Sequence, residues 1–141
     1  MQRTVLVLSA LILLALSAGC GGKANLSTPE GAAQAYLDAV KAGDAKALSQ
    51  LYDYTTYARG QNPDWDAIPP GQRDLIIRKV AEDRAKELEG QMQQLQADLK
   101  DATVGPVSAG ESQASVKLEG APQVGSLTLV RQGEKWYIAL P

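Results

Sequence analysis

Aromatic side chains gather in one short segment of the chain, where they are the residue types best suited to binding a small ligand. Four of the seven aromatic residues fall between positions 52 and 65: Tyr52, Tyr54, Tyr57 and Trp65. Aromatic rings stack on apolar ligands, and the tyrosine hydroxyl or indole N–H fixes the pose of the ligand. Large rings also close the end of a hydrophobic core, and this structural use is the commoner one. The sequence therefore predicts at this segment either a ligand cavity or its lid, or a seal over the core.

Three carboxylates, Asp53, Asp64 and Asp66, lie in the same segment. General acid–base catalysis needs a carboxyl group held in a dry pocket with a raised pKa. The acidic residues near the C-terminus fall at predicted strand ends or turns, off the apolar faces: Glu111, Glu119 and Glu134. Solvated acids in loops far outnumber catalytic ones. We therefore expect no catalytic residue, and an enzyme that uses the three aspartates is the alternative.

Two absences remove much of the remaining chemistry. The chain has no histidine and one cysteine, which excludes Ser-His and Cys-His catalysis, imidazole metal sites and an intrachain disulfide. Its 14 basic and 16 acidic residues leave no positive excess to attract nucleic acid. We expect no metal, no cofactor and no nucleic-acid partner.

The single cysteine, Cys20, follows a stretch typical of an export signal. Arg3 supplies a positive charge, and residues 5–16 are apolar except for one serine. That run is too short to span a hydrocarbon core of about 30 Å. The small residues Ala18 and Gly19 precede the position where a signal peptidase would cut. The alternative is an ordinary signal peptide, or an uncleaved helix, in which the cysteine is incidental.

The segment Leu16-Ser17-Ala18-Gly19-Cys20 resembles the lipobox of bacterial lipoproteins, with serine where the pattern prefers leucine. The resemblance implies that Leu16, Ser17, Ala18 and Gly19 are recognised by the signal peptidase. It also implies that Cys20 carries a thioether-linked diacylglycerol and an N-acyl chain such as palmitate. The expected partners are then the membrane, through the lipid anchor, and the machinery of lipoprotein maturation and sorting.

This resemblance also sets the expected organisation of the N-terminus. Residues 1–19 form the predicted signal peptide, and residues 20–27 the lipidated N-terminus and a flexible tether. Gly21 stands where inner-membrane retention in Gram-negative bacteria favours aspartate. The expected location is therefore the cell envelope, at the outer membrane facing the periplasm if the source is Gram-negative.

Residues 28–141 are predicted to form one α+β domain that opens with helices. Thr28-Pro29-Glu30 is a typical helix start, with a hydroxyl cap, a first-turn proline and a carboxylate. An apolar face follows at helical spacing: Ala32, Ala35, Tyr36, Ala39 and Val40. Gly43 ends this helix, and Asp44 caps a second one that we expect to reach about Tyr52. Residues 53–72, with three prolines and two glycines, are predicted to be a loop.

The strongest helical pattern runs over residues 73–100. Its apolar stripe consists of Ile77, Val80, Ala81, Ala85, Leu88, Met92, Leu95 and Leu99. Such a helix is about 42 Å long, more than the roughly 35 Å diameter of a domain of this size. We therefore expect a kink at Gly90 or a projecting end. Four glutamines could present a partner-binding surface or a coiled-coil arm, although packing on the sheet is the simpler use of the stripe: Gln91, Gln93, Gln94 and Gln96.

Beyond residue 102 the apolar pattern changes to a period of two, which indicates strands. Residues 113–119 alternate clearly, and residues 124–131 and 135–140 are predicted to pair through a tight turn at 132–134. Residues 103–108 form a weaker strand. Helices followed by an antiparallel sheet of three to four strands define an α+β fold, with two short helices and one long one packed on the sheet.

Two segments resemble small envelope domains related to nuclear transport factor 2. Residues 28–44 are similar to the first helix and Gly-Asp turn of those domains, and residues 127–138 to their closing hairpin with Lys-Trp after a glycine turn. The similarity extends to a lipoprotein family with a domain of unknown function. It implies a curved sheet on helices that often enclose a conical cavity, a fold that in some isomerases and hydrolases uses an Asp or Tyr inside the cone.

These patterns together predict a lipid-anchored, non-catalytic binding or accessory module of the cell envelope. The identity of its protein or small-molecule partner stays open. One alternative is an isomerase-like or hydrolase-like enzyme that works in the cone cavity. The other is a structural protein that binds a partner through the long third helix.

Overall fold

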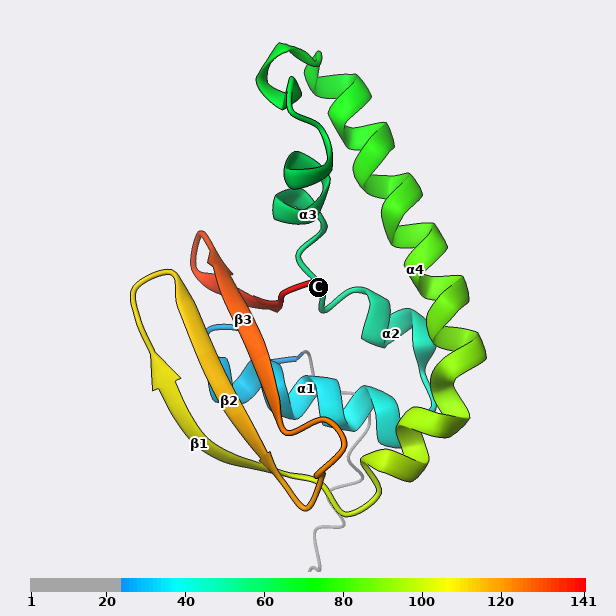
Figure 1. The fold of residues 1–141 in the computed structure, drawn as a ribbon, viewed down its shortest axis with the longest axis vertical. Coiled ribbons are helices and arrows are strands. Elements are labelled where there is room, and N and C mark those ends of the chain that lie inside the picture. The colour runs from blue at the N-terminus through cyan, green and yellow to red at the C-terminus, as the bar shows by residue number, and fades with distance from the viewer. Residues whose placement is uncertain (1–23) are drawn as a thin grey trace, which may run out of the picture.

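Helices precede the sheet in the chain, as the sequence pattern predicted (Figure 1). The computed structural model describes residues 24–141, so the predicted signal peptide and Cys20 lie outside the described residues. The elements are α1 (Pro29–Ala42), α2 (Ala45–Ser49), α3 (Tyr54–Gln61), the 3₁₀ turn η1 (Trp65–Ala67), α4 (Pro70–Asp98), β1 (Thr103–Ala109), β2 (Gln113–Glu119), β3 (Ser126–Gln132) and β4 (Lys135–Ile138). The α+β class is therefore confirmed.

α1 begins and ends at the predicted residues. The Thr28 hydroxyl accepts a hydrogen bond from the Gly31 amide at 3.1 Å, which satisfies one of the free N–H groups of the first turn. Gly43 closes the helix with φ 69°, a left-handed conformation that glycine adopts without a Cβ clash. The inner face carries Ala32, Ala33, Tyr36, Leu37 and Val40, all buried.

The second helix is shorter than predicted, because the chain leaves it to pair with β4. α2 ends at Ser49 rather than near Tyr52. The Ile138 amide donates to the Leu51 carbonyl at 2.7 Å, and the Asp53 amide donates to the Ile138 carbonyl at 2.8 Å. These bonds place Tyr52 in a parallel bridge with Ile138 and extend the backbone where a helix was expected.

The prediction of a loop over residues 53–72 was wrong. Tyr54–Gln61 forms α3, and Trp65–Ala67 forms a 3₁₀ turn. The Asp53 carboxylate caps α3 by accepting from the Thr56 amide at 3.1 Å, and α3 packs against α4. The structure thus has four α-helices among the described residues, rather than two short and one long.

α4 is the long predicted helix, but it begins at Pro70 instead of residue 73. The N–H groups of the first helical turn have no partner within the helix, so proline, which has no N–H, loses nothing at this position. This explains why α4 starts at Pro70. The helix runs without a break through Gly90 to Asp98. Leu88 and Met92 are buried, whereas the N-terminal half lies beside α3 and extends beyond the sheet (Figure 1). The expected projecting end is observed, and the axis of α4 also changes direction in its C-terminal third (Figure 1).

The sheet is antiparallel with strand order β1-β2-β3-β4. β2 has the predicted bounds, but β3 begins at Ser126 rather than residue 124, because a turn holds Gly125 at φ 71°. β4 ends at Ile138 rather than residue 140. A register shift between Val104 and Val107 interrupts the weaker first strand.

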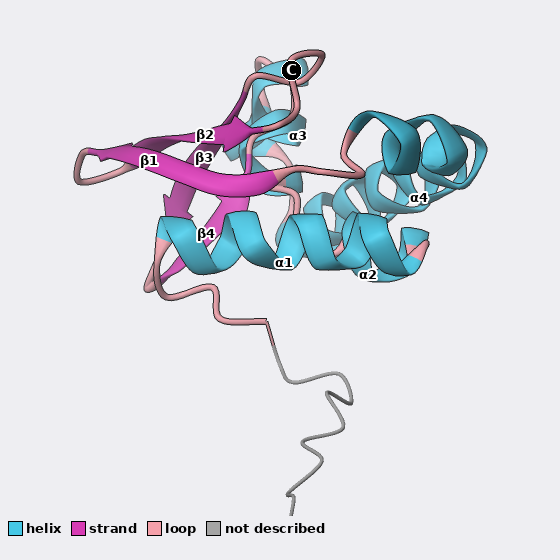
Figure 2. Ribbon diagram, turned by 90° about the horizontal axis from the view of Figure 1, so that it is seen from below, coloured by secondary structure: helices cyan, strands magenta, loops and turns pink. Residues whose placement is uncertain are grey.

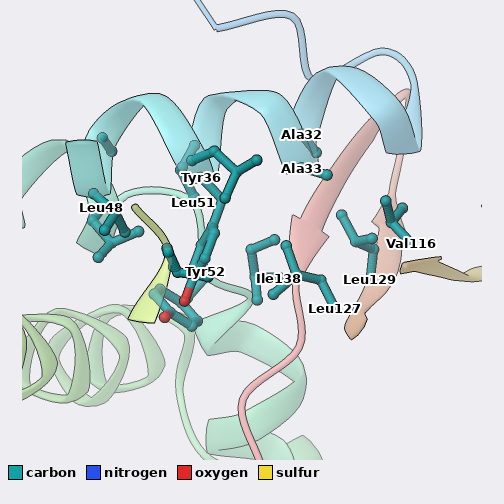
Figure 3. Close-up of a cluster of buried hydrophobic side chains, with 14 of the residues drawn as sticks. Ala32, Ala33, Tyr36, Leu48, Leu51, Tyr52, Val116, Leu127, Leu129 and Ile138 are labelled. Atoms are coloured by element: carbon teal, nitrogen blue, oxygen red, sulfur yellow. The ribbon is translucent and has the colours of Figure 1, made fainter. Parts of the chain in front are cut away.

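One face of the sheet carries the core and packs on α1. Its buried side chains are Ala114, Val116, Leu118, Leu127, Leu129, Trp136 and Ile138. α1 runs across this face, whereas α4 lies to one side of it (Figure 2). Figure 3 shows side chains of α1 meeting those of β2, β3 and β4 in one apolar cluster. The strand alternation and the core position of Trp136 are as predicted.

Candidate functional site

Two adjoining hollows open beside the core, where the last residues of the chain pass between the sheet and α4. They measure about 390 and 530 Å³, and both are lined by Arg84, Leu140 and Pro141. The larger is also lined by Tyr36, Tyr52, Val124, Ser126, Leu127, Thr128, Ile138 and Ala139, and the smaller by Tyr57, Val80, Asp83 and Glu87. We call the two hollows together the central pocket. Its size is in the range of sites that hold a small molecule, roughly 300–1,000 Å³.

Arg84 of α4 is the cation of the central pocket. Its guanidinium carbon lies 5.1 Å from the centre of the Tyr52 ring, a cation–π distance. Nη1 donates to Oε2 of Glu87 at 3.0 Å, and the side chain is 22% exposed. Nε is buried and has no hydrogen-bond partner among the described residues. Burial lowers the pKa of Arg84, but the Tyr52 hydroxyl and Glu87 outweigh it and raise this pKa, so the guanidinium stays charged.

Tyr36 and Tyr52 line the larger hollow. Tyr36 comes from α1 and Tyr52 from the bridge to β4, and they lie side by side (Figure 3). Both are less than a tenth exposed. Burial, and then proximity to Tyr52, raises the pKa of the Tyr36 hydroxyl well above its ordinary value. Tyr36 therefore keeps its proton and can donate a hydrogen bond at any ordinary pH.

The four aromatic residues singled out in the sequence separate in the structure. Tyr52 and Tyr57 line the central pocket. The Tyr54 ring lies 6.3 Å from that of Tyr52, but its hydroxyl donates to the Ser49 carbonyl and it lines neither hollow. Burial raises the pKa of Tyr54 to about 12.

Trp65 lies apart from these tyrosines, in η1 between α3 and α4. It is 4% exposed, and the Arg73 guanidinium lies 5.9 Å from its ring centre. Arg73 also donates to the Ile68 carbonyl at 2.7 Å and the Asp66 carbonyl at 2.8 Å. Trp65 thus fills the small interior of this turn and does not line the central pocket.

The three aspartates do not converge on the central pocket. Asp53 is 4% exposed, and both of its oxygens are engaged. Oδ1 accepts from the Thr56 amide, and Oδ2 accepts from Nε2 of Gln132 at 3.2 Å. Asp64 and Asp66 are exposed, and Asp66 lies 3.6 Å from Arg59. These contacts give Asp53 a structural role and leave the other two in solvent.

Two carboxylates that the sequence did not single out, Asp83 and Glu87, lie at the rim of the smaller hollow. Each is already paired, Asp83 with Lys79 at 2.6 Å and Glu87 with Arg84. The hydrogen bond from Lys79 lowers the pKa of Asp83. Within residues 24–141, no three His, Cys, Asp or Glu side chains come together as a set of metal ligands.

Arg84 and Tyr36 are two further pocket residues that the sequence did not single out. Tyr36 was assigned to the apolar face of the first helix, which is correct but says nothing of its neighbours. Arg84 stands one turn before Leu88, so its position next to the buried stripe of α4 was a usable signal. Its pairing with Tyr52 depends on the tertiary packing of α4, which contacts α1, α2 and α3.

Comparisons of the chain with protein-family models, with curated proteins and with solved structures found no match.

Proposed function

We propose that the protein is a lipid-anchored, non-catalytic binding module of the cell envelope, with a domain like nuclear transport factor 2 and the central pocket as its ligand site. The observation that carries the binding role is the larger hollow of the pocket, in which a mostly apolar lining includes one charged guanidinium. Apolar lining with a few placed polar groups is the usual character of small-molecule sites.

The proposed fold relationship rests on the arrangement of the helices around the sheet. α1 crosses the inner face of the antiparallel sheet, and α3 and α4 stand at one end of it (Figures 1 and 2). The pocket lies between them, as a cone cavity would. A binding role is favoured over catalysis because Asp53, the buried one of the three candidate aspartates, has both oxygens engaged.

The proposed anchor is the lipidated thiol of Cys20. Two or three acyl chains, each CH₂ contributing about 0.8 kcal/mol, hold a protein stably at a membrane. Among residues 24–141, no helix is long and apolar enough to cross a bilayer. The first described residues lie along the outer side of α1, where the Leu26 carbonyl accepts from the Trp136 amide at 2.7 Å. The groove that holds these first residues shares no lining residue with the central pocket. A tether there would therefore leave the central pocket open.

The anchor is tested by Cys20→Ala in cells labelled with palmitate. The wild-type chain should incorporate label and fractionate with membranes, and Cys20→Ala should do neither. Ser17→Leu, which brings the segment closer to the lipobox pattern, is the matched control and should remain labelled. Label on the Cys20→Ala chain would overturn the proposed anchor.

The binding role is tested with a small neutral probe, 4-phenylbutanol, on the full chain in lipid nanodiscs, with empty nanodiscs as the blank. Saturation-transfer NMR should detect binding to the wild-type chain. Val80→Trp, which adds bulk to the pocket lining, should abolish it. Ser115→Trp, exposed on β2, should not. Binding that survives Val80→Trp unchanged would place the ligand site elsewhere.

A further inference from the structure

We propose that the central pocket selects ligands with a carboxylate group on an apolar body, and that Arg84 is the residue that binds the carboxylate. This inference rests on the proposed binding function and names its ligand class. It depends on the unused hydrogen-bonding capacity of Arg84, on the walls beside it and on the charges around it.

The Arg84 guanidinium is charged, but part of it, including Nε, is buried away from water. An arginine side chain does not lose its proton in proteins, so its N–H groups need acceptors wherever it is buried. Nη1 has Glu87, and the Tyr52 ring covers one face of the guanidinium. The buried Nε has no acceptor among the described residues. The structure therefore leaves a charged donor without an acceptor on a side chain that lines both hollows.

The unsatisfied donor is on the edge of the guanidinium that recognises carboxylates. Nε and Nη2 point in parallel and can each donate to one oxygen of a carboxylate, which gives a bidentate pair. Glu87 does not occupy this edge, because its contact is to Nη1. A carboxylate of a ligand would thus satisfy Nε without displacing the ion pair that already exists.

The walls next to Arg84 suit an apolar body. Leu127, Ile138 and Leu140 line the larger hollow, and Val80 lines the smaller one. Tyr36 and Tyr52 line the same hollow and add two aromatic rings to its apolar surface. A ligand that fills the hollow would place its charged end at Arg84 and its apolar end along the strands.

The positive charge of Arg84 is shared by both hollows, whereas the two acids of the central pocket line only the smaller one. The charged side chains that line the pocket are Arg84, Asp83 and Glu87. Both acids lie at the rim and are paired, Asp83 with Lys79 and Glu87 with Arg84. Arg84 is therefore the only charged side chain that lines the larger hollow within the described residues.

The test compares two soluble probes of matched shape, 4-phenylbutyrate and 4-phenylbutanol, on the full chain in nanodiscs. We expect the carboxylate to bind the wild-type chain about tenfold more tightly than the alcohol, as a charge-assisted pair should. Arg84→Gln should remove this preference and leave the affinity for the alcohol in place. Arg59→Gln, an exposed arginine on α3, is the control and should keep the preference.

A second variant keeps the test decisive if Arg84→Gln does not fold. Glu87→Gln removes a negative charge next to the guanidinium, so carboxylate binding should tighten by a few-fold while alcohol binding stays constant. An equal affinity for both probes in the wild-type chain, an unchanged preference in Arg84→Gln, or weaker carboxylate binding in Glu87→Gln would each overturn the inference. Failure of both probes to bind would instead overturn the proposed binding function along with it.

Discussion

Gln132 at the end of β3 holds Asp53 at the start of α3, although 79 residues separate them. Nε2 of Gln132 donates to Oδ2 of Asp53 at 3.2 Å and to Oγ1 of Thr56 at 3.0 Å. Oδ1 of Asp53 meanwhile caps α3. One buried carboxylate thus satisfies the helix start and fixes the base of the α3–α4 projection to the sheet.

Removal of this carboxylate should destabilise the fold. Asp53→Ala loses an N-cap, worth about 0.5–2 kcal/mol, and leaves the Gln132 amide with one acceptor fewer. We expect the free energy of unfolding in urea to fall by about 2 kcal/mol in total. Asp64→Ala is the control, because Asp64 is exposed and makes no side-chain cap, and it should change stability by less than about 0.5 kcal/mol. Equal effects of the two substitutions would contradict the structural role of Asp53.

Substitution by alanine should change the stability in opposite directions at two glycines, one at the end of α1 and one within α4. Gly43 has φ 69°, and a Cβ there would meet Nε2 of Gln96 at 3.2 Å. Gly90 lies in α4 with nothing within 4 Å of an added Cβ. Gly43→Ala should lose about 1 kcal/mol, and Gly90→Ala should gain about 0.5–1 kcal/mol through helix propensity and a less flexible unfolded chain. Urea unfolding of both variants measures this, and changes of the same sign would refute it.

Local patterns were enough to predict α1 and the core strands. The Thr28 cap, the Gly43 stop and the alternation of Ala114, Val116 and Leu118 are determined by neighbouring residues. Such signals act within a turn or a strand, so they can be read from the chain without its tertiary contacts.

α3 and the central pocket depend on residues far apart in the chain. Tyr54–Gln61 has no continuous apolar stripe, and its helix relies on the Asp53 cap, on Gln132 and on α4. Trp65 was predicted to act with Tyr52 because the two are close in the chain. In the structure α3 separates them, and Trp65 lies outside the pocket. Arg84 comes to Tyr52 through the packing of α4 on the other helices. Sequence spacing alone contains none of these relationships.

The turn between α3 and α4 should depend on Arg73. Its two hydrogen bonds to the Ile68 and Asp66 carbonyls and its position over Trp65 close this turn. Arg73→Ala should cost about 1–2 kcal/mol of unfolding free energy and make Trp65 more accessible to acrylamide quenching. Trp136 should not respond, since it lies in the sheet core.

Arg78→Ala is the matched control for Arg73. Arg78 is exposed and donates only to the Asp74 carbonyl of its own helix, at 3.4 Å. Its removal should change neither the quenching nor the stability by more than about 0.5 kcal/mol. If acrylamide quenches the tryptophan fluorescence of Arg73→Ala no more than that of Arg78→Ala, Arg73 does not cover Trp65 in solution.

Alkaline pH should reveal the buried hydroxyls of Tyr36 and Tyr54. Burial raises the pKa of Tyr54 to about 12 and that of Tyr36 well above its ordinary value. The folded state then holds these protons more tightly than the unfolded chain, whose tyrosines ionise near pH 10. Their contribution to stability is therefore intact below about pH 10 and is lost as pH rises toward 12.

An ultraviolet titration of tyrosinate measures this directly. Of the five tyrosines, Tyr36 and Tyr54 should remain protonated in the folded protein at about pH 11, whereas all five should ionise near pH 10 in urea. Tyr54→Phe should remove one late hydroxyl and make the alkaline decline in unfolding free energy shallower. Ionisation of all five together near pH 10 in the folded state would show that neither hydroxyl is shielded from water as the structure places it.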